Sequence, residues 1–204
     1  NGTSYEGVTR VATETTTAST ATPKGIAASH IQEIECLALA SALDTRLFDP
    51  LTPIEFSTVL SCFVKVKLPD HQCVHSAGEL KGVVSDATLE VIQEMVKLGN
   101  KYKDVAASVR LPFEEDYMQY NLCELVGEWC VAKSEAECME IIKKAGSYDI
   151  LMGEWVKAMM KICNIVNELD RICVLQGNMK LLKTLKDIPD LLMKFIVINQ
   201  SLYV

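Results

Sequence analysis

The fold of this chain is decided by residues 149–175, DILMGEWVKAMMKICNIVNELDRICVL. Large apolar side chains recur in this stretch at steps of three and four, so they share one face of an α-helix. These side chains are Trp155, Met159, Ile162, Val166, Leu169 and Ile172. We predict one long helix over 149–175 whose apolar face lies in the core of the domain.

A second stripe on the same helix is polar and follows the same spacing. Its members are Lys157, Lys161, Asn164, Glu168 and Arg171. Ammonium, amide and guanidinium groups bind phosphates and base edges, so the stripe is a candidate nucleic-acid surface. A solvated face on a core helix is the commoner use of such a stripe. The pattern by itself leaves both interpretations open.

The composition of the 204 residues indicates an all-α domain. Hydrophobic residues make up 49% of the chain and aromatic residues only 6%, so aliphatic side chains supply most of the core. This is typical of a helical bundle rather than a β-sandwich, whose strands favour aromatic and β-branched residues. Capping and periodicity signals predict a bundle of six or seven helices, including the long one.

The first residues of the chain differ from the rest. Thr, Ala and Ser dominate residues 1–23, which offer few large apolar side chains to offset the entropy of ordering. We therefore expect a flexible linker or strap there, and a single domain over residues 24–204. The chain does not begin with Met, and we interpret it as a fragment of a longer protein.

Local capping signals predict where the other helices begin. Ser29 with Gln32 predicts a helix reaching about Asp44, and Thr52-Pro53-Ile54-Glu55 predicts another. Residues 65–84 have the features of a long connection. The remaining helices are expected over about 85–109, 114–130, 134–144 and 178–204.

Two residues are expected to interrupt this helical pattern. Gly177 should end the long helix, because a C-terminal cap favours glycine. Pro189 lacks a backbone donor, so it should kink or split the last helix.

The charge and the cysteines limit the kinds of function. A net charge of −7 argues against tight binding of nucleic acid by this chain alone, because such binders carry a basic face. Most of the eight cysteines lie inside apolar helical patterns, so we interpret them as core residues of an intracellular protein. Nucleus and cytoplasm both remain open. No apolar run reaches the length of a membrane span.

The sequence contains no clear motif for a catalytic or metal site. Cys62, His71, Cys73 and His75 carry the side chains that bind zinc, but their spacing matches no familiar finger. Free side chains are the favoured interpretation, and we predict no metal site. The chain has no Gly-rich phosphate loop, metalloprotease motif or serine-hydrolase elbow. We predict no catalytic residue and no cofactor within these residues.

Six short motifs together resemble one family. They are Lys24-Gly25, Leu47-Phe48-Asp49-Pro50-Leu51, Leu60-Ser61-Cys62-Phe63-Val64, Glu128-Trp129-Cys130, Gly177-Asn178 and Ser201-Leu202-Tyr203-Val204. In this order and spacing they resemble the C-terminal helical (DSHCT) domain of superkiller-type, exosome-associated DExH-box RNA helicases. The connection at 65–84 and the proline at 189 depart from the family pattern, so the chain resembles a divergent member.

The resemblance implies a function for the longer protein. Such proteins are ATP-dependent 3′–5′ RNA helicases that use ATP and Mg in RNA processing or decay. Their C-terminal domain packs on the RecA-like core of the same chain and lines the RNA path. The implied partners are this core, single-stranded RNA and exosome-type RNA-decay factors, with no membrane. The alternative is a helical protein-interaction scaffold without RNA contact.

The resemblance also implies roles for residues of the long helix. This helix corresponds to the family's ratchet helix, which touches RNA bases. The family's contacting Arg corresponds to Lys161, its Glu partner to Asn164, and a further basic residue to Lys157. Lys lacks the planar fork of Arg and Asn carries no charge, so RNA contact is expected to be weaker or differently tuned. The RNA-binding candidates are Lys157, Lys161, Asn164 and Arg171.

Overall fold

The computed structural model describes residues 21–113 and 117–195 of the chain. Within these ranges the protein is all-helical, and its only β-pairing is an isolated bridge between Lys81 and Val84. The predicted all-α fold is confirmed. Eight α-helices occupy the described residues, so the prediction of six or seven was too low. They are α1 (Pro23–Ser29), α2 (Cys36–Asp44), α3 (Pro53–Ser61), α4 (Asp86–Ser108), α5 (Cys123–Val131), α6 (Glu135–Ser147), α7 (Met152–Gln176) and α8 (Met179–Leu192).

Helix α7 confirms the long helix, although it begins at Met152 rather than at residue 149. All six side chains of its predicted apolar face are buried. At its N-terminus the Leu151 N–H donates to the Glu154 carboxylate at 3.2 Å. Gly177 ends the helix with φ of +67°, a left-handed conformation that strains glycine least.

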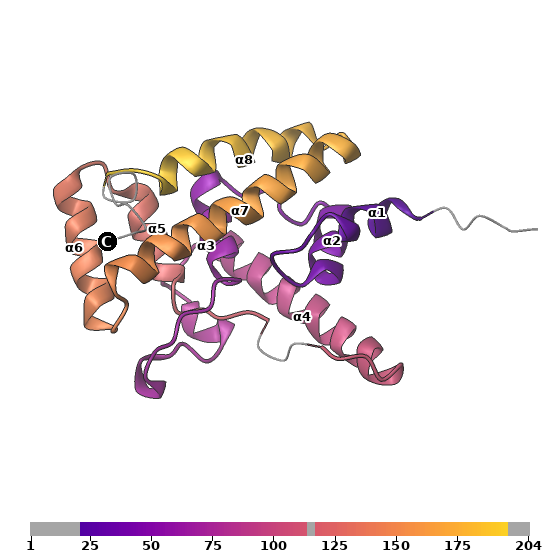
Figure 1. Ribbon diagram of the computed structural model, residues 1–204, viewed down its shortest axis with the longest axis horizontal. Coiled ribbons are helices and arrows are strands. Elements are labelled where there is room, and N and C mark those ends of the chain that lie inside the picture. The colour runs from indigo at the N-terminus through magenta and orange to yellow at the C-terminus, as the bar shows by residue number, and fades with distance from the viewer. Residues whose placement is uncertain (1–20, 114–116, 196–204) are drawn as a thin grey trace, which may run out of the picture.

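Helices α7 and α8 lie antiparallel, side by side along one edge of the domain (Figure 1). Helix α3 occupies the middle of the bundle and contacts α4, α5, α7 and α8. Its residues 56–61 are all buried, as expected for a helix surrounded by others. Helix α6 packs on α5 and α7 at one end, and α1 pairs with α2 at the other (Figure 1).

Two tryptophans join three of these helices in the core. Trp129 of α5 and Trp155 of α7 meet edge to face, with ring centroids 5.4 Å apart. The Trp129 indole N–H donates to the backbone oxygen of Leu192 in α8 at 3.0 Å. Both rings are fully buried. Large aromatic side chains contribute much of the burial energy, so this contact stabilises the α5–α7–α8 corner.

The predicted helix from Ser29 to Asp44 ends where expected but was wrong at its start. Ser29 is the last residue of α1, and its hydroxyl donates to the backbone oxygen of Ile26 rather than capping a new helix. Helix α2 begins only at Cys36, where the Glu35 carboxylate accepts from the first backbone N–H groups. Residues 30–35 form a link between the two helices. Hydrogen bonds from Gln32 and Glu33 to Glu168 of α7 hold this link out of the helical conformation.

The predicted helix over 114–130 was also wrong at its start. Helix α5 begins at Cys123, and the described residues 117–122 precede it without helix. The Gln119 N–H donates to the backbone oxygen of Cys62 at 2.7 Å. The Gln119 side-chain oxygen accepts from the Val66 N–H at 3.1 Å. This pairing with residues 62–66 overrides the local helical pattern. Residues 114–116 lie outside the described residues.

Other boundaries agree with their local signals. The Thr52–Glu55 capping box opens α3, Ser85 caps α4, and the Ser134–Glu137 box opens α6. Residues 65–84 form a connection that contains two 3₁₀ turns, Asp70–Gln72 and Ala77–Leu80. Helix α6 continues to Ser147, past its predicted end at Lys144.

The predictions for the two ends of the chain are tested only in part. Pro189 lies inside α8, which continues to Leu192, so the helix is not split there. Residues 193–195 are not helical, and the rest of the predicted 178–204 helix lies outside the described residues. The linker predicted over 1–23 also lies mostly outside them. Helix α1 already begins at Pro23.

Candidate nucleic-acid interface

The polar stripe of α7 lies at the surface of the domain. Lys157, Asn164 and Arg171 are exposed, and the Lys161 side chain retains 34% of its accessible surface. The stripe follows from helical geometry, because residues at steps of three and four share a face opposite the buried stripe. Lys157, Asn164 and Arg171 are therefore accessible either to solvent or to a ligand.

The link between α1 and α2 crosses the middle of this stripe. The Lys161 ammonium donates to the backbone oxygen of Glu33 at 2.9 Å and also contacts the Glu33 carboxylate. Further along the helix, the Glu168 carboxylate accepts from the N–H groups of Gln32 at 3.1 Å and Glu33 at 3.3 Å. Two members of the stripe thus hold the link instead of facing bulk water.

Lys157 and Lys161 line an open groove of about 730 Å³. Its other walls come from the α1–α2 link and from residues 63–67, which follow α3. Two further lysines, Lys65 and Lys67, line the groove from that side, and both are exposed. Against four lysines the groove presents three carboxylates, those of Glu33, Glu35 and Glu154. A locally basic groove therefore exists on an acidic chain.

Hydrogen bonds and aromatic packing hold the wall formed by residues 63–67. The two bonds made by Gln119 fix the chain at Cys62 and Val66. Beside them the Phe63 and Tyr117 rings lie 6.4 Å apart, and the Tyr117 hydroxyl donates to the Met95 backbone oxygen at 2.5 Å. Burial raises the pKa of Tyr117 well above its ordinary value, so the phenol stays protonated and keeps this bond.

This geometry lies within a match to one family. The chain matches the DSHCT (NUC185) domain over residues 18–200, which include every described helix. The chain belongs to the DSHCT family. The DSHCT domain is a C-terminal domain of superkiller-type RNA helicases. No curated protein sequence matches the chain.

The four candidate residues of the DSHCT domain do not converge on one place. The groove brings Lys157 and Lys161 together, whereas Asn164 and Arg171 lie further along α7 and do not line it. Lys65 and Lys67 were not predicted. The signal for them was the alternation Lys65-Val66-Lys67 directly after an apolar helix, since alternate residues of an extended segment point the same way.

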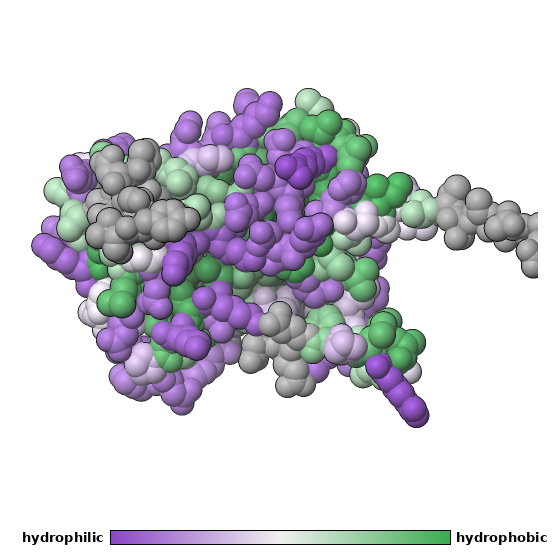
Figure 2. Space-filling model, viewed as in Figure 1, coloured by the Kyte–Doolittle hydropathy of each residue, from purple (hydrophilic) through white to green (hydrophobic). Residues whose placement is uncertain are grey.

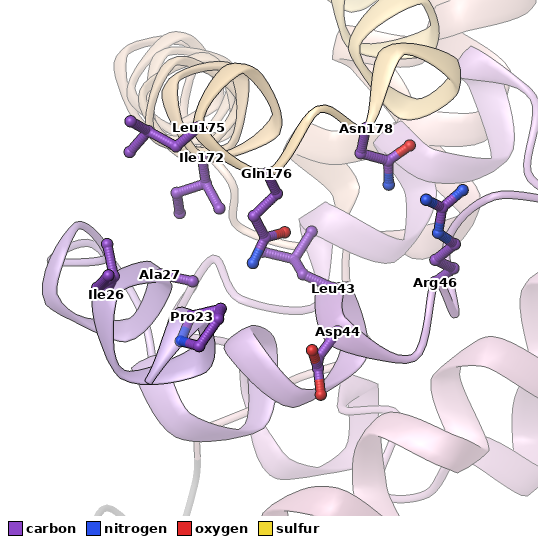
Figure 3. A pocket seen from close by; sticks show the side chains of 10 residues that line it. All are labelled: Pro23, Ile26, Ala27, Leu43, Asp44, Arg46, Ile172, Leu175, Gln176 and Asn178. Atoms are coloured by element: carbon purple, nitrogen blue, oxygen red, sulfur yellow. The ribbon is translucent and has the colours of Figure 1, made fainter. Parts of the chain in front are cut away.

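A second hollow of the DSHCT domain lies where α1 and α2 approach the junction of α7 and α8. It measures about 500 Å³, and Figure 3 shows its mixed lining, in which Ile26 and Leu175 accompany Asp44 and Arg46. Leu175 is 61% exposed. Apolar surface gathers where α7 and α8 meet (Figure 2). Apolar side chains at the surface are typical of protein contacts, so this end of the domain fits the scaffold alternative.

The four side chains considered as zinc ligands, Cys62, His71, Cys73 and His75, do not come together in the DSHCT domain. The Cys62 sulfur lies 3.3 Å from the Cys123 sulfur inside the core, and the Cys73 thiol donates to nearby backbone oxygens. The Nε2 atom of His75 lies 4.0 Å from Oδ1 of Asp70. Among residues 21–113 and 117–195, no three metal-binding side chains come together. Nor does this part of the chain contain a helix long and apolar enough to span a membrane.

Proposed function

We propose that this DSHCT domain lines the RNA path of an ATP-dependent 3′–5′ RNA helicase that acts in RNA processing or decay. The observation that carries the proposal is that Lys157 and Lys161 of α7 line one open groove instead of pointing into the core. Ammonium groups bind phosphate as point charges, without selecting a base. The domain would therefore guide the strand and contribute little sequence preference.

The proposal assigns different roles to the four residues of the stripe. Lys157, which is exposed, would meet a phosphate directly. Lys161 would meet RNA only by exchanging its contacts with Glu33. Asn164 and Arg171 would meet the strand further along α7, where Asn can pair with a base edge and Arg can stack on one.

The chemistry of ATP hydrolysis is assigned to another part of the protein. ATP and Mg would bind the RecA-like core of the same chain, against which this domain would pack. Exosome-type decay factors would act on the same RNA, in the nucleus or the cytoplasm. Because the charge of the chain is −7, the isolated domain is expected to bind RNA weakly or not at all.

The test is RNA-stimulated ATPase and unwinding by the full-length protein. The variant combines Lys157→Ala with Lys161→Ala, and its matched control combines Lys180→Ala with Lys183→Ala on the exposed side of α8. We expect the first variant to lose unwinding while it keeps basal ATPase, and the control to behave as wild type. Unwinding at the wild-type rate in the first variant would contradict the proposal.

One observation favours a second function, that of a protein-interaction scaffold. Val174, Leu175 and Met179, at the junction of α7 and α8, are each at least 60% exposed. A Leu175→Glu variant that loses a protein partner but unwinds RNA normally would support the scaffold role for this end. Lys157 and Lys161 lie in the first half of α7 and Leu175 lies at its end, so the lysine variant and the Leu175 variant separate the two functions.

A further inference from the structure

We infer that Lys65 and Lys67 form the second wall of the RNA path, so that the phosphate backbone lies between them and Lys157. The inference rests on the proposed function, in which α7 supplies the first wall. It adds a segment outside α7, residues 63–67, to the RNA-contacting surface.

The first argument is placement. Lys65 and Lys67 are exposed and line the same groove as Lys157, which belongs to a helix about ninety residues further along the chain. Val66, between the two lysines, packs against the hydrophobic core. Burial of the middle residue keeps the flanking lysines on the outside, and their long stems let the ammonium groups reach into the groove.

The second argument is that the wall is held in place before any ligand arrives. The Val66 N–H bonds the Gln119 side chain, and the Gln119 N–H bonds the Cys62 backbone. Phe63 and Val64, on the same segment, are buried. Because the backbone is already ordered, binding does not carry the additional entropic cost of ordering this segment.

The third argument is electrostatic. Each of the three carboxylates of the groove is engaged within the domain, and none needs an external cation. Glu33 pairs with Lys161, Glu35 accepts from the first N–H groups of α2, and Glu154 accepts from the Leu151 N–H of α7. Helix N-termini carry partial positive charge, which offsets the second and third carboxylates. Counted over its whole lining, the groove holds four lysines against three carboxylates, and this net positive charge favours a polyanion.

The occupant favoured by these observations is single-stranded RNA rather than an acidic peptide. The groove is open and binds through point charges on two sides, which suits a continuous chain of phosphates. Membership of the DSHCT family places the groove on a domain of RNA helicases. An acidic peptide is the competing occupant. Measuring the affinity of the Lys65→Ala, Lys67→Ala variant for RNA and for an acidic peptide distinguishes the two occupants.

The test measures binding of the full-length protein to a uridine oligonucleotide over a series of salt concentrations. The variant is Lys65→Ala with Lys67→Ala, and the matched control is Lys180→Ala with Lys183→Ala. Loss of two phosphate contacts should weaken binding. It should also reduce the steepness of the plot of log binding constant against log salt concentration by about 1.4, since each contact on a single strand contributes about 0.7 to the slope. The control should keep the wild-type slope. Both pairs are exposed, and an unchanged thermal unfolding midpoint verifies folding.

Three results would overturn the inference, and they differ in what they say of the proposed function. If Lys157→Ala weakens binding but the Lys65/Lys67 variant does not, the inference fails and the proposed function stands. If neither affects RNA binding, both fail. If the Lys65/Lys67 variant keeps its RNA affinity but loses affinity for a poly-glutamate peptide, the groove serves a protein partner instead.

Discussion

The Lys161 ammonium contacts both the backbone oxygen and the carboxylate of Glu33, a residue 128 positions earlier in the chain. This contact fastens the α1–α2 link across the middle of α7. It also neutralises the lysine that corresponds by family resemblance to the RNA-contacting arginine. The structural role of Lys161 and the RNA-binding role that we propose for it would therefore compete for one side chain.

Removing the charge of Glu33 tests this competition. Glu33→Gln should lower the free energy of unfolding by about 0.5–1 kcal/mol, because the ion pair is partly exposed and screened. In urea unfolding the difference from wild type should shrink at high salt, on the order of 1 M. The same variant should raise the RNA affinity of the full-length protein, because Lys161 is released.

The control is Glu140→Gln, which changes an exposed glutamate of α6. Lower RNA affinity in Glu33→Gln would show that the pair supports the groove rather than competing with RNA.

Glu168 should matter more for the α1–α2 link than its charged neighbours on the stripe. Its carboxylate accepts from two backbone N–H groups, so Glu168→Ala removes two charge-assisted hydrogen bonds at once. We expect a loss of about 1–2 kcal/mol in unfolding free energy, and faster amide hydrogen exchange at Gln32 and Glu33. Arg171→Ala, exposed on the same stripe, should change stability by less than about 0.5 kcal/mol. Equal effects of the two substitutions would exclude a special role for Glu168.

The capping box of α3 should contribute to stability above acidic pH. Burial raises the pKa of Glu55, but hydrogen bonds from Ser85 and Thr52 outweigh it, so the net pKa lies below the ordinary value. A group whose pKa is depressed by folding stabilises the protein above its unfolded pKa, about 4.3 for Glu. That stability is lost as pH falls through the lower folded pKa. Glu55→Gln should therefore lower stability at neutral pH and lose less stability than wild type as the pH falls from about 5 to about 3.

The control for this pH dependence is again Glu140→Gln, which should retain the wild-type profile. Urea unfolding at each pH supplies the measurement. If Glu55→Gln and wild type lose equal stability on acidification, the hydrogen bonds seen at Glu55 do not act through its ionised form.

Local signals predicted the parts of the fold that depend only on local chemistry. The Thr52–Glu55 box, the long apolar stripe of α7 and the glycine cap at Gly177 all lie where expected, because each is a matter of a few neighbouring residues. The two helices whose starts were predicted wrongly fail for one reason. Contacts far apart in sequence, from Glu168 to the α1–α2 link and from Gln119 to residues 62–66, outweigh the local helical preference.

The candidate site, like the fold, was predicted only where it depends on neighbouring residues. Periodicity correctly placed Lys157 and Lys161 on the surface face of a helix. It could not reveal that Glu33 pairs with Lys161, or that Lys65 and Lys67 line the same groove. Those relationships arise from packing between α7, the α1–α2 link and the segment after α3, which no local pattern encodes.

Gly99 of α4 is expected to be essential for the wall of the groove that contains Tyr117. A Cβ atom at position 99 would lie 2.0 Å from the Tyr117 hydroxyl oxygen and 2.1 Å from its ring, so the ring must move away. Movement breaks the bond to Met95 and disturbs the contact with Phe63. Although Ala favours helix by about 1 kcal/mol over Gly, Gly99→Ala should destabilise the domain by about 1–3 kcal/mol net.

The chain offers a matched control for this substitution. Gly146 lies inside α6, and a Cβ atom at this position would meet no side chain within 4 Å, so Gly146→Ala should stabilise the domain by about 0.5–1 kcal/mol. Thermal and urea unfolding measure both variants. Adding Tyr117→Ala to Gly99→Ala removes the clash, so the second substitution should cost less in the Gly99→Ala background than in wild type. Purely additive effects would mean that α4 accommodates the methyl group without displacing Tyr117.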